Sequence, residues 1–363
     1  MAETLIDLSG LPRICTPALD AFQSALEGSS ETPFDALSRR KAPIYELAGF
    51  TESDTFSFTA SGAESINEVH WTAFIERARK EGKCHFVTTP NEDASLLQSL
   101  KRLEDLGCFV HIAPVDSYGR VDVAKLRALL GPKIAMLSMS AANRLTGVVQ
   151  PLSEIGALAQ EMGVWLHLEA SHTLAKMPHV NADYLTFDGS ALHAGPGSGG
   201  AFARSGKPLL SFLLGAEINV PAFMALSAAC AHATLYVDTM GLEIARLRAL
   251  LEEGIRERVP GAVPLFTDCL RLPDASTLLF PHIHQESLLY ALRRKGLGVS
   301  IGGGSAPHLH RQLQTCGFDE LAALSALSFS LNRFTSQADV ERAIALIAET
   351  CKQLRPLAED LFP

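Results

Sequence analysis

Short apolar runs alternate with longer amphipathic segments through the first half of this chain. The runs that read as strands are residues 83–89, 109–113, 134–139 and 164–168. The helical patterns between them are residues 98–106, 123–130 and 152–162, and Gly163 follows the last of these. Because strands that are joined through helices lie parallel, this order predicts a mostly parallel sheet with helices on both faces. Such sheets bind ligands beyond the carboxyl ends of their strands.

The last third of the chain is organised differently. Two long helical patterns, residues 222–236 and 242–258, lead into alternating short strands and helices, which predict a smaller α+β domain. A length of 363 residues is sufficient for two domains. We predict a large α/β domain over residues 12–245 and a small domain formed by residues 1–11 and 246–363.

Composition argues against several classes of protein. The formal net charge of −9 disfavours a nucleic-acid or anionic-membrane surface. The seven cysteines include no Cys-x-x-Cys pair, so neither a zinc motif nor a disulfide framework is indicated. The start of the sequence has no signal-peptide pattern, and the apolar residues 220–237 contain His232 and small residues, as a packed interior helix does. We therefore expect a cytoplasmic protein that binds neither nucleic acid nor membranes.

A series of short motifs follows a defined order along the chain. The motifs are residues 58–63, 88–93, 115–122, 146–152, 167–172, 176–178, 197–204 and 328–335. In this order and spacing they resemble the cysteine desulfurase (NifS-like) branch of the class V aminotransferases. The resemblance implies a large domain of the fold-type-I pyridoxal-phosphate transferase class, a pyridoxal phosphate cofactor and a homodimer. Since one fold can carry many functions, each site position is compared separately.

The position of the family's cofactor lysine is changed. In the family, the turn after a buried strand carries a serine, a histidine and the lysine that forms an imine with pyridoxal phosphate. This chain has Asp188, Ser190 and Ala191 at those positions. A methyl group cannot form an imine. The resemblance therefore implies a member whose pyridoxal-phosphate site is degenerate.

The family's phosphate-binding loop corresponds to Ser61, Gly62 and Ala63, followed by Glu64 in place of a threonine. A helix that begins after such a loop offers free backbone N–H groups to an anion. A carboxylate next to a phosphate dianion is repulsive. We expect Glu64 either to disfavour the phosphate or to accept hydrogen bonds from these N–H groups itself.

The positions around the cofactor ring are changed as well. Asp93 replaces the histidine that stacks on the ring, and Glu169 replaces the aspartate at the pyridinium nitrogen. His172 stands where the family has a glutamine near the ring oxygen. The family's asparagine at that oxygen corresponds to Asn143 or Arg144, because one inserted residue allows two registers.

The substrate positions lack their reactive groups. Ser328 stands where the family has the arginine that binds the substrate carboxylate, and Ser305 where it has the persulfide cysteine. A serine has no thiolate and carries no persulfide. Lys176 corresponds to a different lysine of the family and reads as a surface residue.

These positions predict a non-catalytic homologue with a regulatory, partner-binding or small-ligand role, for which no cofactor is expected. The carboxylates of Glu64, Asp93, Glu169 and Asp188 could converge with His172 in a pocket for a metal or another cation of unknown identity. Alternatively these charges pair locally, for example Arg144 with Glu169. The expected partners are a second copy of the chain, an active desulfurase or a sulfur acceptor.

The alternative is a pyridoxal-phosphate-dependent cysteine desulfurase or aminotransferase with atypical site residues. Without the lysine at position 191, the cofactor would then be bound non-covalently.

Overall fold

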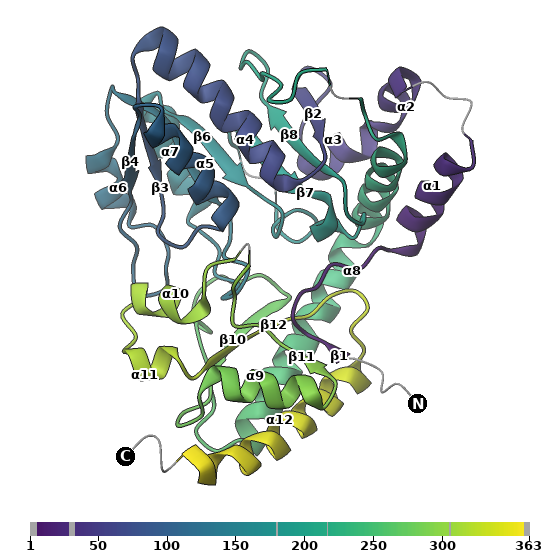
Figure 1. Cartoon of the computed structure of the whole chain (residues 1–363), viewed down its shortest axis with the longest axis vertical. Helices are drawn as coiled ribbons and strands as arrows, with labels where there is room; N and C mark the ends of the chain where they lie inside the picture. The colour runs from purple at the N-terminus through teal and green to yellow at the C-terminus, as the bar shows by residue number, and fades with distance from the viewer. Residues whose placement is uncertain (1–5, 29–32, 179–180, 216, 305, 359–363) are drawn as a thin grey trace.

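A seven-stranded sheet forms the centre of the larger domain (Figure 1). Its order is β2 (Thr55–Thr59), β8 (Gly199–Ala203), β7 (Tyr184–Asp188), β6 (Trp165–Glu169), β5 (Ile134–Ser140), β3 (His85–Thr88) and β4 (Phe109–Ile112). Strand β8 is antiparallel to both β2 and β7, whereas the other neighbouring pairs are parallel. The prediction of a mostly parallel sheet is therefore confirmed. This computed structural model describes residues 6–28, 33–178, 181–215, 217–304 and 306–358.

Helices cover both faces of this sheet because successive strand residues point to opposite sides. On one face, Phe86 packs in a core cluster with α4 (Gly62–Ala73) and α5 (Ala94–Asp105). On the other face, Val87 packs with α6 (Val123–Leu129) and α7 (Leu152–Met162). A π-helical turn, Phe74–Arg79, continues α4. As predicted, α7 ends at Gly163, whose φ of 64° is the left-handed conformation that glycine adopts easily.

The smaller domain is built around two short sheets. The strands β12 (Ala326–Ser330), β10 (Ala275–Leu279) and β9 (Val263–Pro264) form an antiparallel sheet, and β1 (Ile6–Asp7) pairs in parallel with β11 (Leu297–Gly298). The helices of this domain are α9 (Gln285–Arg294), α10 (Leu309–Thr315), α11 (Glu320–Ala323) and α12 (Gln337–Ala358). Leu8, near the start of the chain, is fully buried in one core cluster with Phe329 and Val340. The first described residues thus pack in the small domain.

Helix α8 (Val220–Arg258) connects the two domains, where the sequence predicted two separate helices. Its parts Val220–Leu235 and Val237–Arg258 meet at 76°. The first part packs with α1 (Thr16–Leu26) and α3 (Ala42–Ala48), next to α2 (Pro33–Arg40). The second part packs in the core of the small domain. Since α8 is continuous through residue 245, the predicted domain boundary stays a prediction.

The described helices include none that is by itself long and apolar enough to cross a membrane. The two parts of α8 meet the criteria of length and composition only together, as a bent pair. Packing accounts for the apolar character of the first part, because Phe223, Leu226 and Cys230 are buried in a core cluster.

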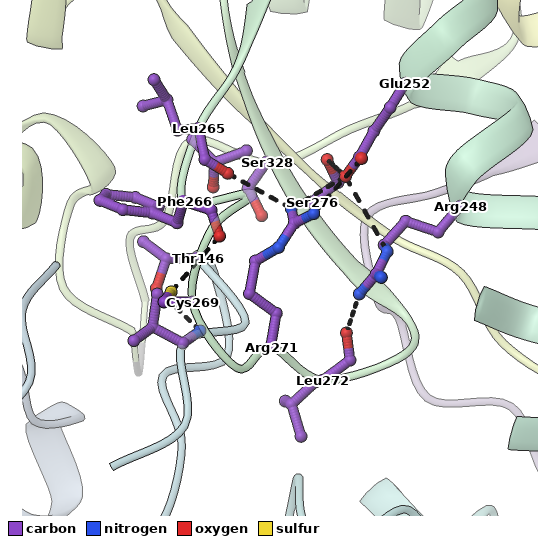
Figure 2. A network of polar contacts seen from close by, with 12 residues as sticks. Thr146, Arg248, Glu252, Leu265, Phe266, Cys269, Arg271, Leu272, Ser276 and Ser328 are labelled. Carbon is purple, nitrogen blue, oxygen red and sulfur yellow. Dashed lines mark hydrogen bonds and ion pairs between the residues drawn. The ribbon is translucent and has the colours of Figure 1, made fainter. Parts of the chain in front are cut away.

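A polar network fastens α8 to the segment before β10 (Figure 2). Arg271 donates from Nη1 to Glu252 Oε1 at 2.9 Å and from Nη2 to Glu252 Oε2 at 3.3 Å. Ser276 Oγ donates to the same carboxylate at 2.7 Å, and Arg248 donates to the Leu272 carbonyl. The network holds residues 271–276 against α8, and this segment carries Asp274 to the site described next.

Candidate functional site

A cavity of about 390 Å³ lies between the central sheet and the small domain. Ser140, Glu169 and Asp188, the last residues of β5, β6 and β7, form part of its lining. Ser330, the last residue of β12, and residues 331–333 after it line the cavity from the small domain. The cavity thus lies at the carboxyl ends of parallel strands, where sheets of this type bind ligands.

Ala191 lines the cavity in the 3₁₀ turn Gly189–Leu192, immediately after β7. Asp188 begins this turn, and its Oδ1 accepts hydrogen bonds from Ser190 N at 2.9 Å and from Ser190 Oγ. Its Oδ2 accepts from Gly62 N, in the first turn of α4, at 2.9 Å. A Cβ atom on Gly62 would lie only 2.9 Å from Asp188 Cβ, so a glycine is required for this approach. The chain's own carboxylate therefore occupies an N–H group of the loop that resembles a phosphate site.

Glu64 does not line the cavity, so it does not take part in the converging pocket that was one of the two alternatives from the sequence. Ser61 caps α4 by accepting from Glu64 N at 3.2 Å, while Glu64 Oε2 accepts from Ala60 N at 2.8 Å. This reciprocal arrangement is a close variant of the capping box. Neither Ser61 nor Glu64 belongs to the cavity lining, whereas Gly62 and Ala63 do. The pattern Ser-x-x-Glu before a helix is a sequence signal for such a cap.

The carboxyl group of Glu169 lines the cavity, and that of Glu92 is buried outside the lining. Glu169 Oε1 accepts from Ser171 N at 2.9 Å and from Ser171 Oγ. Burial raises the pKa of Glu169 to about 7, and the nearby charges of Asp93 and Glu92 act in the same direction. Glu92 accepts from Ser140 N at 2.8 Å and from Thr89 at 2.6 Å, and burial raises its pKa to about 7 as well. The sequence analysis missed Glu92, although it lies inside the quoted motif 88–93.

Arg144 lies 3.7 Å from Asp93, measured between Nη1 and Oδ2, and both residues line the cavity. The predicted pair of Arg144 with Glu169 is therefore replaced by one with Asp93. Asn143, also predicted in the pocket, lies outside the lining. Its Oδ1 accepts from Leu145 N and Thr146 N, each at 3.0 Å, and so it closes its own turn.

Lys176 lines the cavity, although the sequence indicated a surface residue. Its Nζ lies 2.6 Å from Asp274 Oδ2, and the lysine side chain is only 21% exposed. Asp274 comes from the segment that the α8 network holds in place, so the pair joins the two domains across the cavity. His172 also lines the cavity, and burial lowers its pKa well below the usual range, with Lys176 and Arg144 acting in the same direction.

Arg333 lines the cavity, although the sequence analysis did not single it out. It follows β12, and its Nη1 lies 2.7 Å from His232 Nδ1. Burial lowers the pKa of this guanidinium. Nearby, burial lowers the pKa of His193 to about 4, and the positive charges of Arg333 and Lys176 contribute. Arg333 lies within the quoted motif 328–335, which was the only signal for it.

The substrate positions taken from the resemblance lie elsewhere. Ser328 is fully buried in β12 and donates to the Leu145 carbonyl at 2.7 Å, so it does not line the cavity. Ser305 lies outside the described residues. The cavity lining, as far as the structure describes it, contains no cysteine. Cys316 is buried, and burial raises the pKa of its thiol to about 12.

The carboxylates do not form a metal centre within the described ranges. No group of three or more histidine, cysteine, aspartate or glutamate side chains there has an arrangement that could hold a metal ion. The physical reason is local neutralisation, since Arg144 and Lys176 each face one cavity carboxylate. Four carboxylates, two lysine or arginine partners and Arg333 make the lining mixed in charge, which agrees with the alternative of local pairing better than with a cation pocket.

Comparison with known proteins identifies the group to which this architecture belongs. Residues 27–217, more than half of the chain, match the family described as aminotransferase class-V. The chain belongs to the class V aminotransferase family. Members of this family use pyridoxal phosphate as cofactor.

Similar class V proteins include "Cysteine desulfurase 2" of Trichormus variabilis, which is 29% identical over 89% of this chain and 84% of its own length. A "Cysteine desulfurase" of Cereibacter sphaeroides is 29% identical over 99% of this chain and 98% of its own length. Among solved structures, a "NIFS-LIKE PROTEIN" has a TM-score of 0.88 at 22% identity, over 97% of this chain and all of that chain. The fold-type-I fold that the resemblance implied is thus confirmed.

Proposed function

We propose that this class V chain has lost pyridoxal-phosphate catalysis and keeps its cavity as a non-catalytic small-molecule site with a regulatory or partner-binding role. The observation that carries the proposal is Ala191 in the turn after β7, which stands where the resemblance places the family's lysine. The covalent cofactor linkage requires a primary amine at that point, and alanine has none.

The loop at the start of α4, which resembles a phosphate site, supports the same proposal. Asp188 already accepts from Gly62 N, so a phosphate dianion would have to displace this carboxylate or lie beside it. Like charges at such a distance repel by several kcal/mol at intermediate dielectric, on the order of 4 kcal/mol per pair of unit charges. These residues do not fit the phosphate group of the cofactor.

The absence of a thiol from the described cavity lining supports it further. A desulfurase must accept sulfur on a nucleophilic thiolate. The buried thiol of Cys316 has a raised pKa of about 12 and stays protonated at neutral pH. No group in the described lining replaces the persulfide carrier.

An absorption spectrum tests the proposal directly. The full-length chain is purified with added pyridoxal phosphate, and the visible imine band is recorded before and after borohydride reduction. We expect colourless protein with no covalently retained cofactor after reduction and denaturation. A visible band that borohydride bleaches, with cofactor bound to one lysine by mass spectrometry, would refute it.

A second candidate is an active pyridoxal-phosphate-dependent desulfurase or aminotransferase with atypical residues. Two observations favour it: the similar proteins named above are cysteine desulfurases, and Lys176 brings a primary amine into the cavity. The Lys176→Ala variant separates the candidates, because an imine on Lys176 would disappear in it. Exposed Lys101→Ala is the matched control, since both variants remove one lysine with a carboxylate partner.

A further inference from the structure

Most charges in the cavity already have a partner in the protein. Asp93 faces Arg144, and Lys176 pairs with Asp274. Asp188 has both oxygens bonded, to Gly62 N and to Ser190. Once these residues are set aside, two charged groups of the lining remain, Glu169 and Arg333. They come from different domains, at the end of β6 and after β12.

Arg333 is held in place without a counter-ion. Within the described ranges, no carboxylate lies within ion-pair distance of its guanidinium, and its hydrogen-bond partner is His232. Two hydrogen bonds hold its loop: Asn332 Oδ1 accepts from Phe334 N at 2.9 Å, and Thr335 Oγ1 accepts from Asn332 N at 3.0 Å. The guanidinium is partly buried, and a partly buried positive charge without an anion favours the binding of one. Its planar fork matches a carboxylate with two parallel hydrogen bonds.

Glu169 offers the complementary group. Its Oε1 is bonded to Ser171, while its Oε2 has no hydrogen bond to any residue in the described part of the chain. The side chain lines the cavity at the end of β6. A protonated amine that reached Oε2 would supply both a hydrogen bond and a counter-charge.

Apolar side chains contribute a large part of the remaining lining. They include Leu145, Leu174, Met240, Ile244 and Leu272. Small-molecule sites combine an apolar wall with a few polar anchors and have volumes of roughly 300 to 1,000 Å³. The cavity of about 390 Å³ lies in the lower part of that range.

We propose that this cavity binds a small aliphatic zwitterion, with its carboxylate on Arg333, its protonated amine on Glu169 and a hydrocarbon spacer along the apolar wall. The proposal rests on the non-catalytic function proposed above. It differs from the cation pocket expected from the sequence, because the ligand must carry an anionic end.

Calorimetric titration of the colourless full-length protein tests the proposed ligand class with a series of zwitterions of increasing length. The zwitterions are γ-aminobutyrate, δ-aminovalerate and ε-aminocaproate, and the matched ligands are diacids and diamines of equal length, together with glycine. We expect the best zwitterion to bind at least about tenfold more tightly than its matched diacid and diamine, because each of these leaves one charge facing its like. We expect glycine, which lacks the spacer, to bind at least about tenfold more weakly. Equal or tighter binding of the diamine, or no binding of any zwitterion, overturns the proposal.

Two variants assign the ends of the ligand. Arg333→Met should weaken zwitterion binding by at least about tenfold and diamine binding by less. Glu169→Gln should remove the advantage of the zwitterion over the matched diacid, a readout that a general loss of packing would not produce. The control is Arg127→Met, which removes an exposed arginine paired with Glu161. Unchanged ligand preference in folded Arg333→Met and Glu169→Gln protein would refute the assignment.

The two proposals fail separately. A bleachable imine band in the purified chain contradicts the non-catalytic function, whatever the titration shows. A colourless chain that binds no zwitterion leaves that function intact and removes only the ligand class.

Discussion

Glu169 illustrates at the scale of one residue how burial sets chemistry. Glu169 is the last residue of β6, and its carboxyl group lines the cavity. Asp93 and Glu92 are its acidic neighbours, and Ser171 donates a hydrogen bond to it. Burial raises its pKa from 4.5 to about 7. The folded protein therefore binds a proton that the unfolded chain releases between these two values. Stability must fall as pH rises through this window, and the full cost is present above about pH 7.

The Glu169→Gln variant tests this sign. At about pH 8 the variant should be more stable than the wild type by about 1 to 3 kcal/mol, because it removes a buried charge but keeps an acceptor for Ser171. At about pH 5 the difference should vanish, since Glu169 is then protonated. Urea denaturation at both pH values measures the effect, with exposed Glu257→Gln as control. A variant that is less stable at high pH than at low pH, relative to wild type, contradicts the argument.

At the scale of the element, the start of α4 forms hydrogen bonds both to its own capping residues and to a residue of the cavity. Ser61 and Glu64 cap its backbone from within, and Asp188, from the end of β7, accepts from Gly62 N. Asp188 and Glu64 thus accept hydrogen bonds from backbone N–H groups at a helix N-terminus, where an external anion would otherwise bind. The sequence indicated this possibility for Glu64, and the structure assigns the cavity side to Asp188.

Glu64→Ala should destabilise the protein by about 0.5 to 1.5 kcal/mol, because Ala60 N loses its acceptor and α4 loses part of its cap. The matched control is Glu154→Ala. Glu154 also lies in the first turn of a helix, α7, but this helix has no side-chain cap hydrogen bond. Chemical denaturation of both variants should show the larger loss for Glu64. Equal losses would indicate that only the helix dipole matters.

At the scale of the whole molecule, the network around Glu252 links α8 to the segment that carries Asp274 (Figure 2). Two guanidinium groups, Arg248 and Arg271, share this one carboxylate. The Arg271 side chain is only 6% exposed, so water cannot replace its partner. The position of the Lys176 pair, and with it one wall of the cavity, depends on this anchor.

Glu252→Gln should therefore cost about 3 to 5 kcal/mol, because it leaves buried positive charges without a counter-charge. Glu253→Gln, one residue further along α8, breaks an exposed pair with Arg256 and should cost less than about 0.5 kcal/mol. Guanidinium denaturation of both variants measures the difference. Similar losses in the two variants would mean that the buried network contributes no more than a surface pair.

The homodimer implied by the resemblance stays a prediction at this scale. Several large apolar side chains, Leu214, Leu235 and Leu242, are at least 75% exposed on the single chain. Light scattering during size-exclusion chromatography determines whether a second copy covers them.

The predicted strands and helices of the large domain agree with the structure because their signal is local. The apolar run 134–139 became β5, and the helical pattern 152–162 became α7 with Gly163 at its end. The two helical patterns 222–236 and 242–258 correspond to the two parts of α8, which the structure joins in one helix bent by 76°. Its two parts pack against different cores, which explains a continuous but bent helix.

The sequence by itself determined the fold, the family and the alanine at position 191, because each depends on the order of residues along the chain. Only the tertiary structure decided which charges meet. Asp188 reaches Gly62 across 126 positions, Arg144 lies beside Asp93, and Lys176 pairs with Asp274 from the other domain. The strength of the interaction between two charges depends on their distance in space and on their burial. For that reason the pocket is mixed in charge, and Arg333 and Glu169 are the charged groups to which we assign the proposed ligand.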